Sequence, residues 1–169
     1  MKKSFIILFI SALLFSSSIF AQNADRYKAL FIYNFTRYIE WPSNGSPDFV
    51  IGILGKSIVA NELINIADKK IVGTQTITIK KFSNATDVTQ CNILFISNDA
   101  SSQVASITAA MQNKNTLIIT DRPGLINKGA GINFVLDDGK QKFELSKTNL
   151  AKTGLKVNTQ LMEMATVVD

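Results

Sequence analysis

Residues 91–97 read CNILFIS, and this stretch is the strongest pointer to the fold class. The run at 92–96 is mostly apolar and does not alternate with polar residues, as in a strand that is buried on both faces of a sheet. Runs of the same kind are FVIGIL at 49–54 and TLIIT at 116–120. By contrast, TITIK at 76–80 alternates, which predicts a strand with one exposed face or a place at the sheet edge.

Two helix-like segments separate these strands. Residues 57–68 and 100–113 both carry apolar residues at helical spacing. The side chains expected to face the sheet are Ile58, Leu63 and Ile64 in the first segment and Val104, Ile107 and Met111 in the second. Apolar strands that alternate with helices indicate parallel strands joined by right-handed crossovers.

The last third of the chain has a different pattern. Two strand-like runs, 131–136 and 140–145, flank an Asp-Gly turn, which is a strong signal for an antiparallel hairpin. Residues 148–168 are expected to form one helix, or a short and a longer helix broken near Gly154. The residues expected to dock on the sheet are Leu155, Leu161, Met162 and Ala165. The sequence therefore predicts a single α/β domain of three-layer character: a mostly parallel sheet flanked by helices, with a C-terminal antiparallel hairpin.

The first residues have the three parts of a secretory signal peptide. Two early lysines are followed by an apolar run at 5–15, and Ala21 is suited to the residue before a cleavage site. The run is too short to span a bilayer comfortably, which disfavours an uncleaved anchor. We therefore expect a cleaved signal peptide over 1–21 and a mature domain over 22–169.

The composition limits the partners and the chemistry of cysteine. The chain has a formal net charge of +5, but its lysines are scattered and form no arginine-rich stripe, so nucleic-acid binding is not expected. A single cysteine excludes an internal disulfide. Because Cys91 lies in an apolar strand, we expect a buried core residue and not a reactive thiol.

The sequence lacks histidine, the most common catalytic side chain. This absence removes the commonest general base, the usual activator of a serine or cysteine nucleophile, and the commonest zinc ligand. Gly55-Lys56-Ser57 is similar to the end of a phosphate-binding loop, but Val50 stands where that motif needs glycine. We interpret Gly55 as a turn and Ser57 as a helix cap. The chain is not expected to be an enzyme or to hold a metal or another cofactor.

Two aspartates follow predicted parallel strands. Asp99 follows the strand at 92–96, and Asp121 follows the strand at 116–120. Ligands bind at this edge of open α/β sheets, so the two carboxylates could line a small-molecule pocket or hold a divalent cation. The alternative is that Asp99 caps the next helix and that Asp121 begins the turn before Pro123, which are the commoner uses of aspartate.

An aromatic segment stands near the start of the expected mature chain. Residues 33–42 read YNFTRYIEWP. They cover the end of a helix that is expected over 25–40, and Pro42 prevents the helix from continuing. The side chains expected to pack on the sheet are Tyr27, Phe31, Phe35 and Tyr38. Trp41 is interpreted either as a packing anchor at the helix end or as part of a binding surface with its polar neighbours. These neighbours are Asn34, Arg37 and Glu40.

The order of several motifs agrees with a known family. The motifs are KALFIYNF at 28–35, EWP at 40–42, FVIGILG at 49–55, CNILFIS at 91–97, GINF at 131–134, FELS at 143–146, GLKV at 154–157 and LMEMA at 161–165. They cover nearly all of the expected mature chain. In these motifs the chain resembles the YfiR family of exported bacterial proteins, relatives of HmsC.

The resemblance implies a periplasmic protein that acts by binding a partner. The best-understood members repress a membrane-bound diguanylate cyclase through its periplasmic sensor region, which keeps cyclic-di-GMP low and restrains biofilm formation. An outer-membrane-linked partner helps to release the repression. Some members carry a redox-sensitive disulfide, which Cys91 alone could not form, and Ser146 replaces the asparagine usual at its place. The identity of the partner, a homodimer and a small-molecule ligand stay open.

Overall fold

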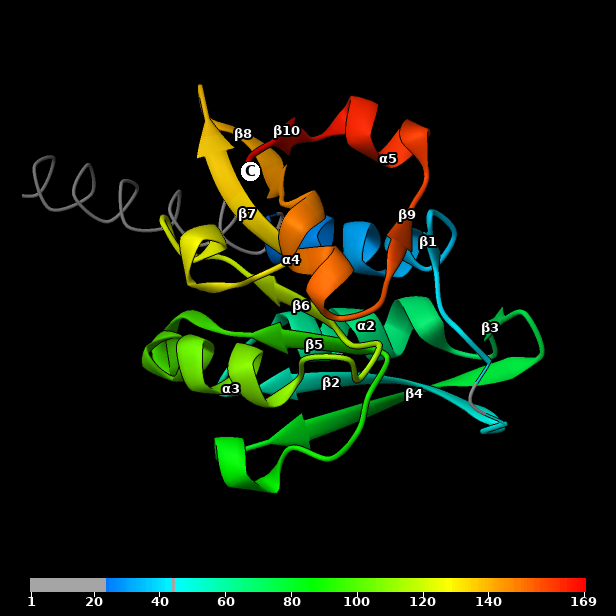
Figure 1. Ribbon diagram of the computed structural model, residues 1–169. Helices are drawn as coiled ribbons and strands as arrows, with labels where there is room; N and C mark the ends of the chain where they lie inside the picture. The colour runs from blue at the N-terminus through cyan, green and yellow to red at the C-terminus, as the bar shows by residue number, and fades with distance from the viewer. Residues whose placement is uncertain (1–23, 44) are drawn as a thin grey trace, which may run out of the picture.

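The computed structural model of the chain describes residues 24–43 and 45–169 (Figure 1). The predicted signal peptide over 1–21 and its cleavage site lie outside these residues. The first described helix covers residues 24–35 and is called the first helix below. The other helices are α2 (Val59–Ala67), α3 (Val104–Ala110), α4 (Lys147–Lys152) and α5 (Thr159–Met164), with the 3-10 helices η1 (Ala85–Asp87), η2 (Asn98–Gln103) and η3 (Ile126–Lys128). The strands are β1 (Ile39–Glu40), β2 (Asp48–Leu54), β3 (Ile71–Val72), β4 (Gln75–Phe82), β5 (Ile93–Ile96), β6 (Leu117–Thr120), β7 (Ile132–Asp137), β8 (Lys140–Leu145), β9 (Lys156–Val157) and β10 (Thr166–Val167).

These strands form one large sheet and one small sheet. The large sheet has the order β10-β8-β7-β6-β5-β2-β4-β3, and β1 pairs with β9 in the small sheet. From β4 to β7 the neighbouring strands are parallel, whereas β3 and β8 run antiparallel to β4 and β7. The predicted α/β class, the mostly parallel sheet and the C-terminal hairpin are therefore confirmed.

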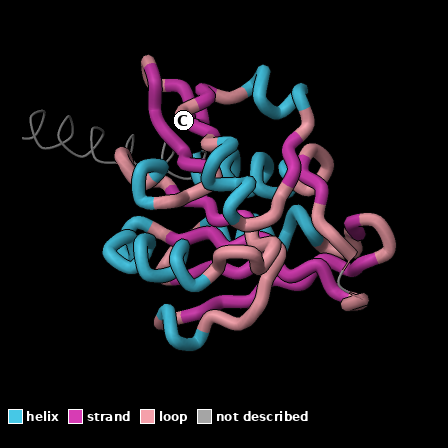
Figure 2. Tube along the Cα trace, in the orientation of Figure 1, coloured by secondary structure: helices cyan, strands magenta, loops and turns pink. Residues whose placement is uncertain are grey.

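Helices lie on both faces of the large sheet, which gives the three layers that the sequence predicts (Figures 1 and 2). Because side chains alternate along a strand, each buried strand supplies both faces. In β2, Ile51 and Ile53 belong to the core cluster that includes the first helix and α2. Val50 and Leu54 belong to the second cluster, which α3 covers.

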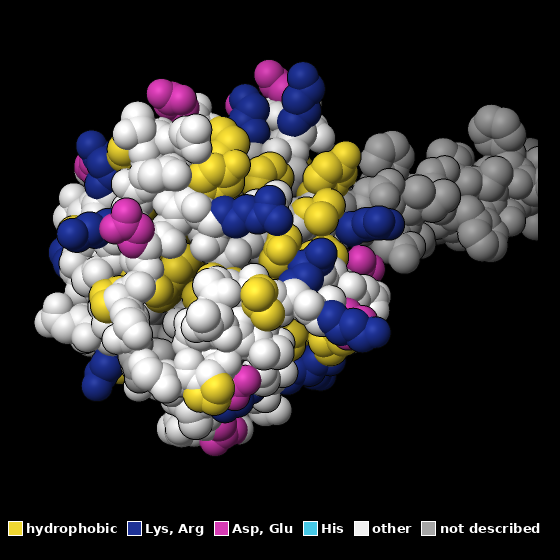
Figure 3. Space-filling view, turned by 90° about the vertical axis from the view of Figure 1, so that its right-hand side faces the viewer, with side chains coloured by type: hydrophobic (Ala, Val, Ile, Leu, Met, Phe, Trp, Pro, Cys, Tyr) yellow, Lys and Arg dark blue, Asp and Glu magenta, His cyan; other side chains and the backbone are white. Residues whose placement is uncertain are grey.

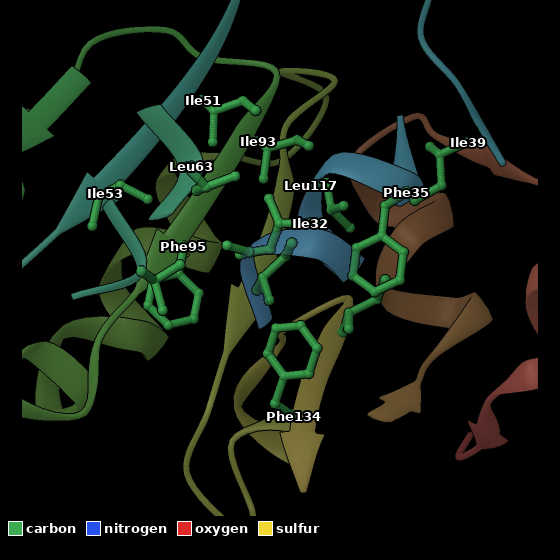
Figure 4. Packing of buried hydrophobic residues seen from close by; sticks show 14 of the residues in the cluster. Ile32, Phe35, Ile39, Ile51, Ile53, Leu63, Ile93, Phe95, Leu117 and Phe134 are labelled. Carbon is green, nitrogen blue, oxygen red and sulfur yellow. The ribbon is translucent and has the colours of Figure 1, made fainter. Parts of the chain in front are cut away.

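Aromatic rings hold the first helix to the C-terminal hairpin. Phe35 is 1% exposed, and its ring centroid lies 5.2 Å from that of Phe143 and 6.1 Å from that of Phe134. Phe31 is partly buried and contacts the same two rings. Figure 4 shows Ile32 and Phe35 projecting from the helix among the core side chains of the sheet. The predicted packing of Phe31 and Phe35 on the sheet is confirmed.

The first helix ends earlier than the sequence predicts, and its outer end is less buried. The helix stops at residue 35, and residues 39–40, predicted as helix, form β1. At the helix end, Thr36 Oγ1 donates to Tyr33 O. Two residues further on, Tyr38 O accepts from Asn158 N beside the β1–β9 pair, so the backbone there bonds to the C-terminal segment instead of continuing the helix. The predicted packing of Tyr27 is wrong, since its side chain is 56% exposed and lies beyond the packed rings.

The predicted inner face of α2 is partly wrong. Leu63 is fully buried as expected, but Ile58 and Ile64 are 52% and 48% exposed. The helix instead buries Val59, Ala60, Leu63 and Ala67. Two small alanines on this face allow the helix to lie close to the sheet, and the isoleucines are left on its outer side.

The C-terminal segment contains two short strands that the sequence did not predict. Gly154, at φ +82°, follows α4 with a left-handed backbone, and β9 follows it. Asn158 Oδ1 accepts from Leu161 N and so caps α5, after which β10 pairs with β8. Leu155 and Leu161 are buried as predicted. The partly buried members of the predicted docking set are Met162 and Ala165.

Candidate functional site

The strand order places a topological switch point between β2 and β5. From β2 the chain crosses to β4 on one side, while β5, β6 and β7 follow on the other side. In doubly wound sheets, ligands bind outside the carboxyl ends of the strands at such a point. Residues 55–57 follow β2 here, and residues 97–99 follow β5.

At this switch point the side chain of Asp99, after β5, binds the backbone of the loop after β2. The Lys56 N–H donates to both carboxylate oxygens of Asp99 at 3.2 Å, and the Ser97 hydroxyl donates to the same carboxylate. Gly55 has φ +87°, and a Cβ atom there would overlap Ser97 Oγ and Asp99 Oδ1. The two loops can approach this closely only because residue 55 is glycine, and Asp99 takes the place where an anion would reach the Lys56 N–H.

Hydrogen bonds hold the pKa of the Asp99 carboxyl below its usual range. The Ser97 hydroxyl is the largest cause, followed by the Lys56 N–H, because both stabilise the charged form. The carboxylate remains exposed to solvent. Asp99 therefore joins two loops, instead of capping the helix that follows it.

Asp121 links the end of β6 to the first helix. Its Oδ2 lies 2.9 Å from Lys28 Nζ, and the same ammonium lies 3.5 Å from Asp25 Oδ1. The Lys28 and Asp121 side chains are only 15% and 13% exposed, and Asp121 Oδ1 is buried without a hydrogen-bond partner in the described chain. Because a buried ion pair gains little net stability, its main effect here is to fix the helix against the strand end.

The two aspartates do not form one acidic site. Asp99 contacts the loop after β2, whereas Asp121 contacts the first helix, and no described hydrogen bond or ion pair joins them. Among the described residues, no group of three His, Cys, Asp or Glu side chains is arranged to hold a metal ion.

Trp41 is anchored to the sheet at the opposite, amino end of the parallel strands. Its indole Nε1 donates to Asn92 O at 3.0 Å, and its ring meets the Phe49 ring edge to face at a centroid distance of 5.1 Å. The side chain is partly buried and packs against the core cluster of the first helix. These contacts are those of a packing anchor.

The polar neighbours of Trp41 lie apart from this anchor. Arg37 is exposed, and its Cζ lies 5.4 Å from the centroid of the Tyr33 ring. Lys70 Nζ lies 5.6 Å from the same centroid. Asn34 O accepts from Arg37 N, and Glu40 is exposed on β1 opposite Lys156 of β9. The structure thus brings Asn34 and Arg37 together on the helix end, with Trp41 turned toward the sheet.

Two hollows, of about 350 and 530 Å³, adjoin Trp41 and the amino ends of the strands. The smaller is lined by Trp41, Pro42, Ser46, Asp48, Val50, Lys80, Gln90, Cys91, Asn92, Lys114 and Asn115. A third hollow of about 270 Å³ lies beside α3 and α4 and includes Lys128 and Lys152. Asp99 and Asp121 line none of these three hollows.

Cys91 has the environment that the sequence predicts. It is 3% exposed and belongs to the core cluster on the α3 side. Burial raises the pKa of the Cys91 thiol to about 12. The prediction of a buried core residue is confirmed.

Sequence reasoning missed two basic residues of the site. Lys28 was not expected to pair with Asp121, and Lys70 was not expected beside Tyr33. A lysine on the side of a helix is usually solvated, so its type gives no signal. Both contacts depend on how the first helix crosses the sheet, which local sequence does not specify.

The fold and its contacts define a doubly wound α/β domain in which Asp99, a carboxylate of the chain itself, binds the loop at the switch point. The chain belongs to the YfiR/HmsC-like family, whose model matches residues 25–166. Proteins of this family are known as periplasmic regulators of cyclic-di-GMP signalling. The curated proteins contain no match to the chain. Across the described residues, every helix is too short or too polar to cross a membrane.

Proposed function

We propose that this protein is a periplasmic regulator that represses a membrane-bound diguanylate cyclase by contacting its periplasmic sensor region. Repression would keep cyclic-di-GMP low and restrain biofilm formation. Membership of the YfiR/HmsC-like family carries this proposal. In this scheme the protein is exported with cleavage after Ala21 and acts by protein–protein contact, not by catalysis.

The arrangement of the surface supports a contact function. The carboxyl ends of the parallel strands, where doubly wound enzymes bind substrates, are closed by Asp99 bound to the Lys56 N–H. The exposed side chains of the described residues include several large apolar ones, such as Tyr27, Leu30 and Leu136, beside charged ones, a mixture that suits a protein partner.

The alternative function, a small-molecule-binding protein with its pocket at the strand carboxyl ends, has less support. Asp99 and Asp121 each have a partner within the chain, on different elements. The hollows described above lie elsewhere, beside the strand amino ends and beside α3 and α4.

Capture of the partner tests the proposal. The tagged exported protein is incubated with detergent-solubilised membranes of its own source, and the bound proteins are identified by mass spectrometry. We expect a membrane protein that carries a diguanylate cyclase domain, and deletion of the gene should raise cellular cyclic-di-GMP. If the captured proteins include no such cyclase and deletion leaves cyclic-di-GMP unchanged, the proposal is wrong.

The residues that make the contact are tested by two substitutions in the same capture. We propose that Asn34 and Arg37 near the helix end, with Glu40 on β1, belong to the binding surface. Arg37→Ala should reduce capture with little change in the melting temperature, since Arg37 is exposed. Trp41→Phe should lower the melting temperature, since it removes the hydrogen bond to Asn92 O. If the Arg37→Ala variant captures the partner normally, Arg37 is not part of the contact surface.

A further inference from the structure

Two cations share the ring of Tyr33 near the end of the first helix, where the ring is partly buried against the core. The Arg37 guanidinium and the Lys70 ammonium lie 5.4 Å and 5.6 Å from the centroid of the Tyr33 ring. Arg37 Nη2 also donates to the Tyr33 hydroxyl at 3.4 Å. Since both distances end at one centroid, the two positive charges are at most about 11 Å apart.

Neither cation is neutralised within the described chain. Its ion pairs use Lys28, Lys142 and Lys147, and none of them includes Arg37 or Lys70. Two exposed cations with no acidic partner create a local positive potential beside the ring. A carboxylate placed there would be attracted by both charges and could accept a hydrogen bond from Arg37 or Lys70.

An exposed aliphatic side chain adjoins the aromatic ring. Leu30 lies one helical turn before Tyr33 and is 38% exposed. Tyrosine and arginine beside aliphatic side chains are typical of the residues that dominate protein interfaces. Figure 3 views the side of the molecule that carries β1, β3 and β9, where basic side chains are interspersed with apolar ones.

We propose that Leu30, Tyr33, Arg37 and Lys70 form a docking surface for a partner segment that presents a carboxylate beside an apolar side chain. The carboxylate binds beside the Tyr33 ring, where both cations attract it, and the apolar side chain packs on Leu30. This inference rests on the proposed function and names its contact surface and the chemistry of its partner. Trp41 is outside the surface, because its indole N–H is already bonded to Asn92 O.

Charge reversal at the two cations tests the surface against the intact cyclase. The probe is the full-length, detergent-solubilised cyclase identified by capture, titrated onto the immobilised exported protein at low and at high salt. The variant Arg37→Glu/Lys70→Glu should weaken binding by about tenfold or more, and the wild type should lose affinity as salt rises. The matched control is Lys128→Glu/Lys140→Glu, which has the same net charge and also changes exposed lysines. It should bind as the wild type does.

The outcomes separate the surface from the function. If the wild type and the Arg37→Glu/Lys70→Glu variant bind the cyclase equally, the docking surface is refuted and the proposed function stands. If the wild type does not bind any cyclase, both are refuted. If both double variants lose binding to the same degree, the effect is one of net charge, and the specific surface is refuted. Thermal melting of each variant shows that lost binding does not reflect lost folding.

Discussion

At the scale of single residues, Trp41 shows how a partner distant in the chain decides the role of a side chain. The sequence places the indole at a helix end, where packing and recognition are both reasonable. The structure supplies Asn92 O and the ring of Phe49 as its partners. Asn92 lies 51 positions further along the chain, so no local pattern could predict this hydrogen bond.

Cys91 is a residue whose role could be predicted, because its neighbours in the chain are themselves core residues. Its thiol is buried, and its pKa is raised to about 12, so the reactive thiolate is scarce at neutral pH. We expect slow labelling by a maleimide or by a disulfide reagent under native conditions, and fast labelling after denaturation. Rapid labelling of the native protein, with circular dichroism unchanged, would contradict this environment.

At the scale of elements, long apolar patterns were predictable, and short pairings were not. The strands β2, β5 and β6 and the hairpin β7–β8 agree with predicted runs, because burial on two faces or an Asp-Gly turn leaves a clear local signal. The two-residue strands β1, β9 and β10 have no such signal. They exist because their backbone groups meet partners that the large sheet has already positioned.

The first helix is expected to owe its place to Phe35. Replacement of this buried ring by alanine should lower the free energy of unfolding by about 3–5 kcal/mol, because it leaves a cavity between the helix and the hairpin rings Phe134 and Phe143. Tyr27→Ala on the same helix is the control, since Tyr27 is largely exposed and should change stability by less than about 0.5 kcal/mol. Urea denaturation measures both. Equal losses for the two variants would mean that the rings are not the main attachment.

The contact between Asp99 and the loop after β2 should make a small, pH-dependent contribution to stability. Because the pKa of the Asp99 carboxyl is lowered in the folded state, this contribution is present above the unfolded pKa of about 3.9 and is lost as pH falls through the folded pKa. The melting temperature of Asp99→Asn should therefore lie below that of the wild type at pH 7, and the gap should narrow as pH falls below about 4. If the difference in melting temperature between Asp99→Asn and the wild type is the same at pH 7 and at a pH below about 4, the charge of Asp99 is not involved.

At the scale of the whole molecule, the candidate site depends on topology more than on motifs. The parallel order that places β2 beside β5 brings Gly55 to Asp99, and the crossing of the first helix brings Tyr33 to Lys70. The sequence identifies Asp99 and Arg37 as candidates because of their position after a strand or on a helix. It does not identify their partners, because those come from elements whose relative placement is set by packing in both core clusters.

The C-terminal segment packs on the core and pairs with the edge of the β7–β8 hairpin. Its removal tests how far the stability of the fold depends on these contacts. Leu161 of α5 is fully buried in the larger core cluster, and β10 pairs with β8. Truncation after Val157 removes both, so it should lower the free energy of unfolding by more than about 3 kcal/mol and expose apolar surface that binds a fluorescent dye.

Deletion of Asp169 alone is the matched control for this truncation. It removes an exposed ion pair with Lys147 and one acceptor for Thr148 N, while α5 and β10 remain. The control should leave the free energy of unfolding nearly unchanged, because exposed ion pairs contribute little. Urea denaturation and dye binding compare the two variants with the intact chain. If the long truncation is as stable as the control, the sheet and the first helix fold without the C-terminal cover, and β10 is an attachment that the core does not need.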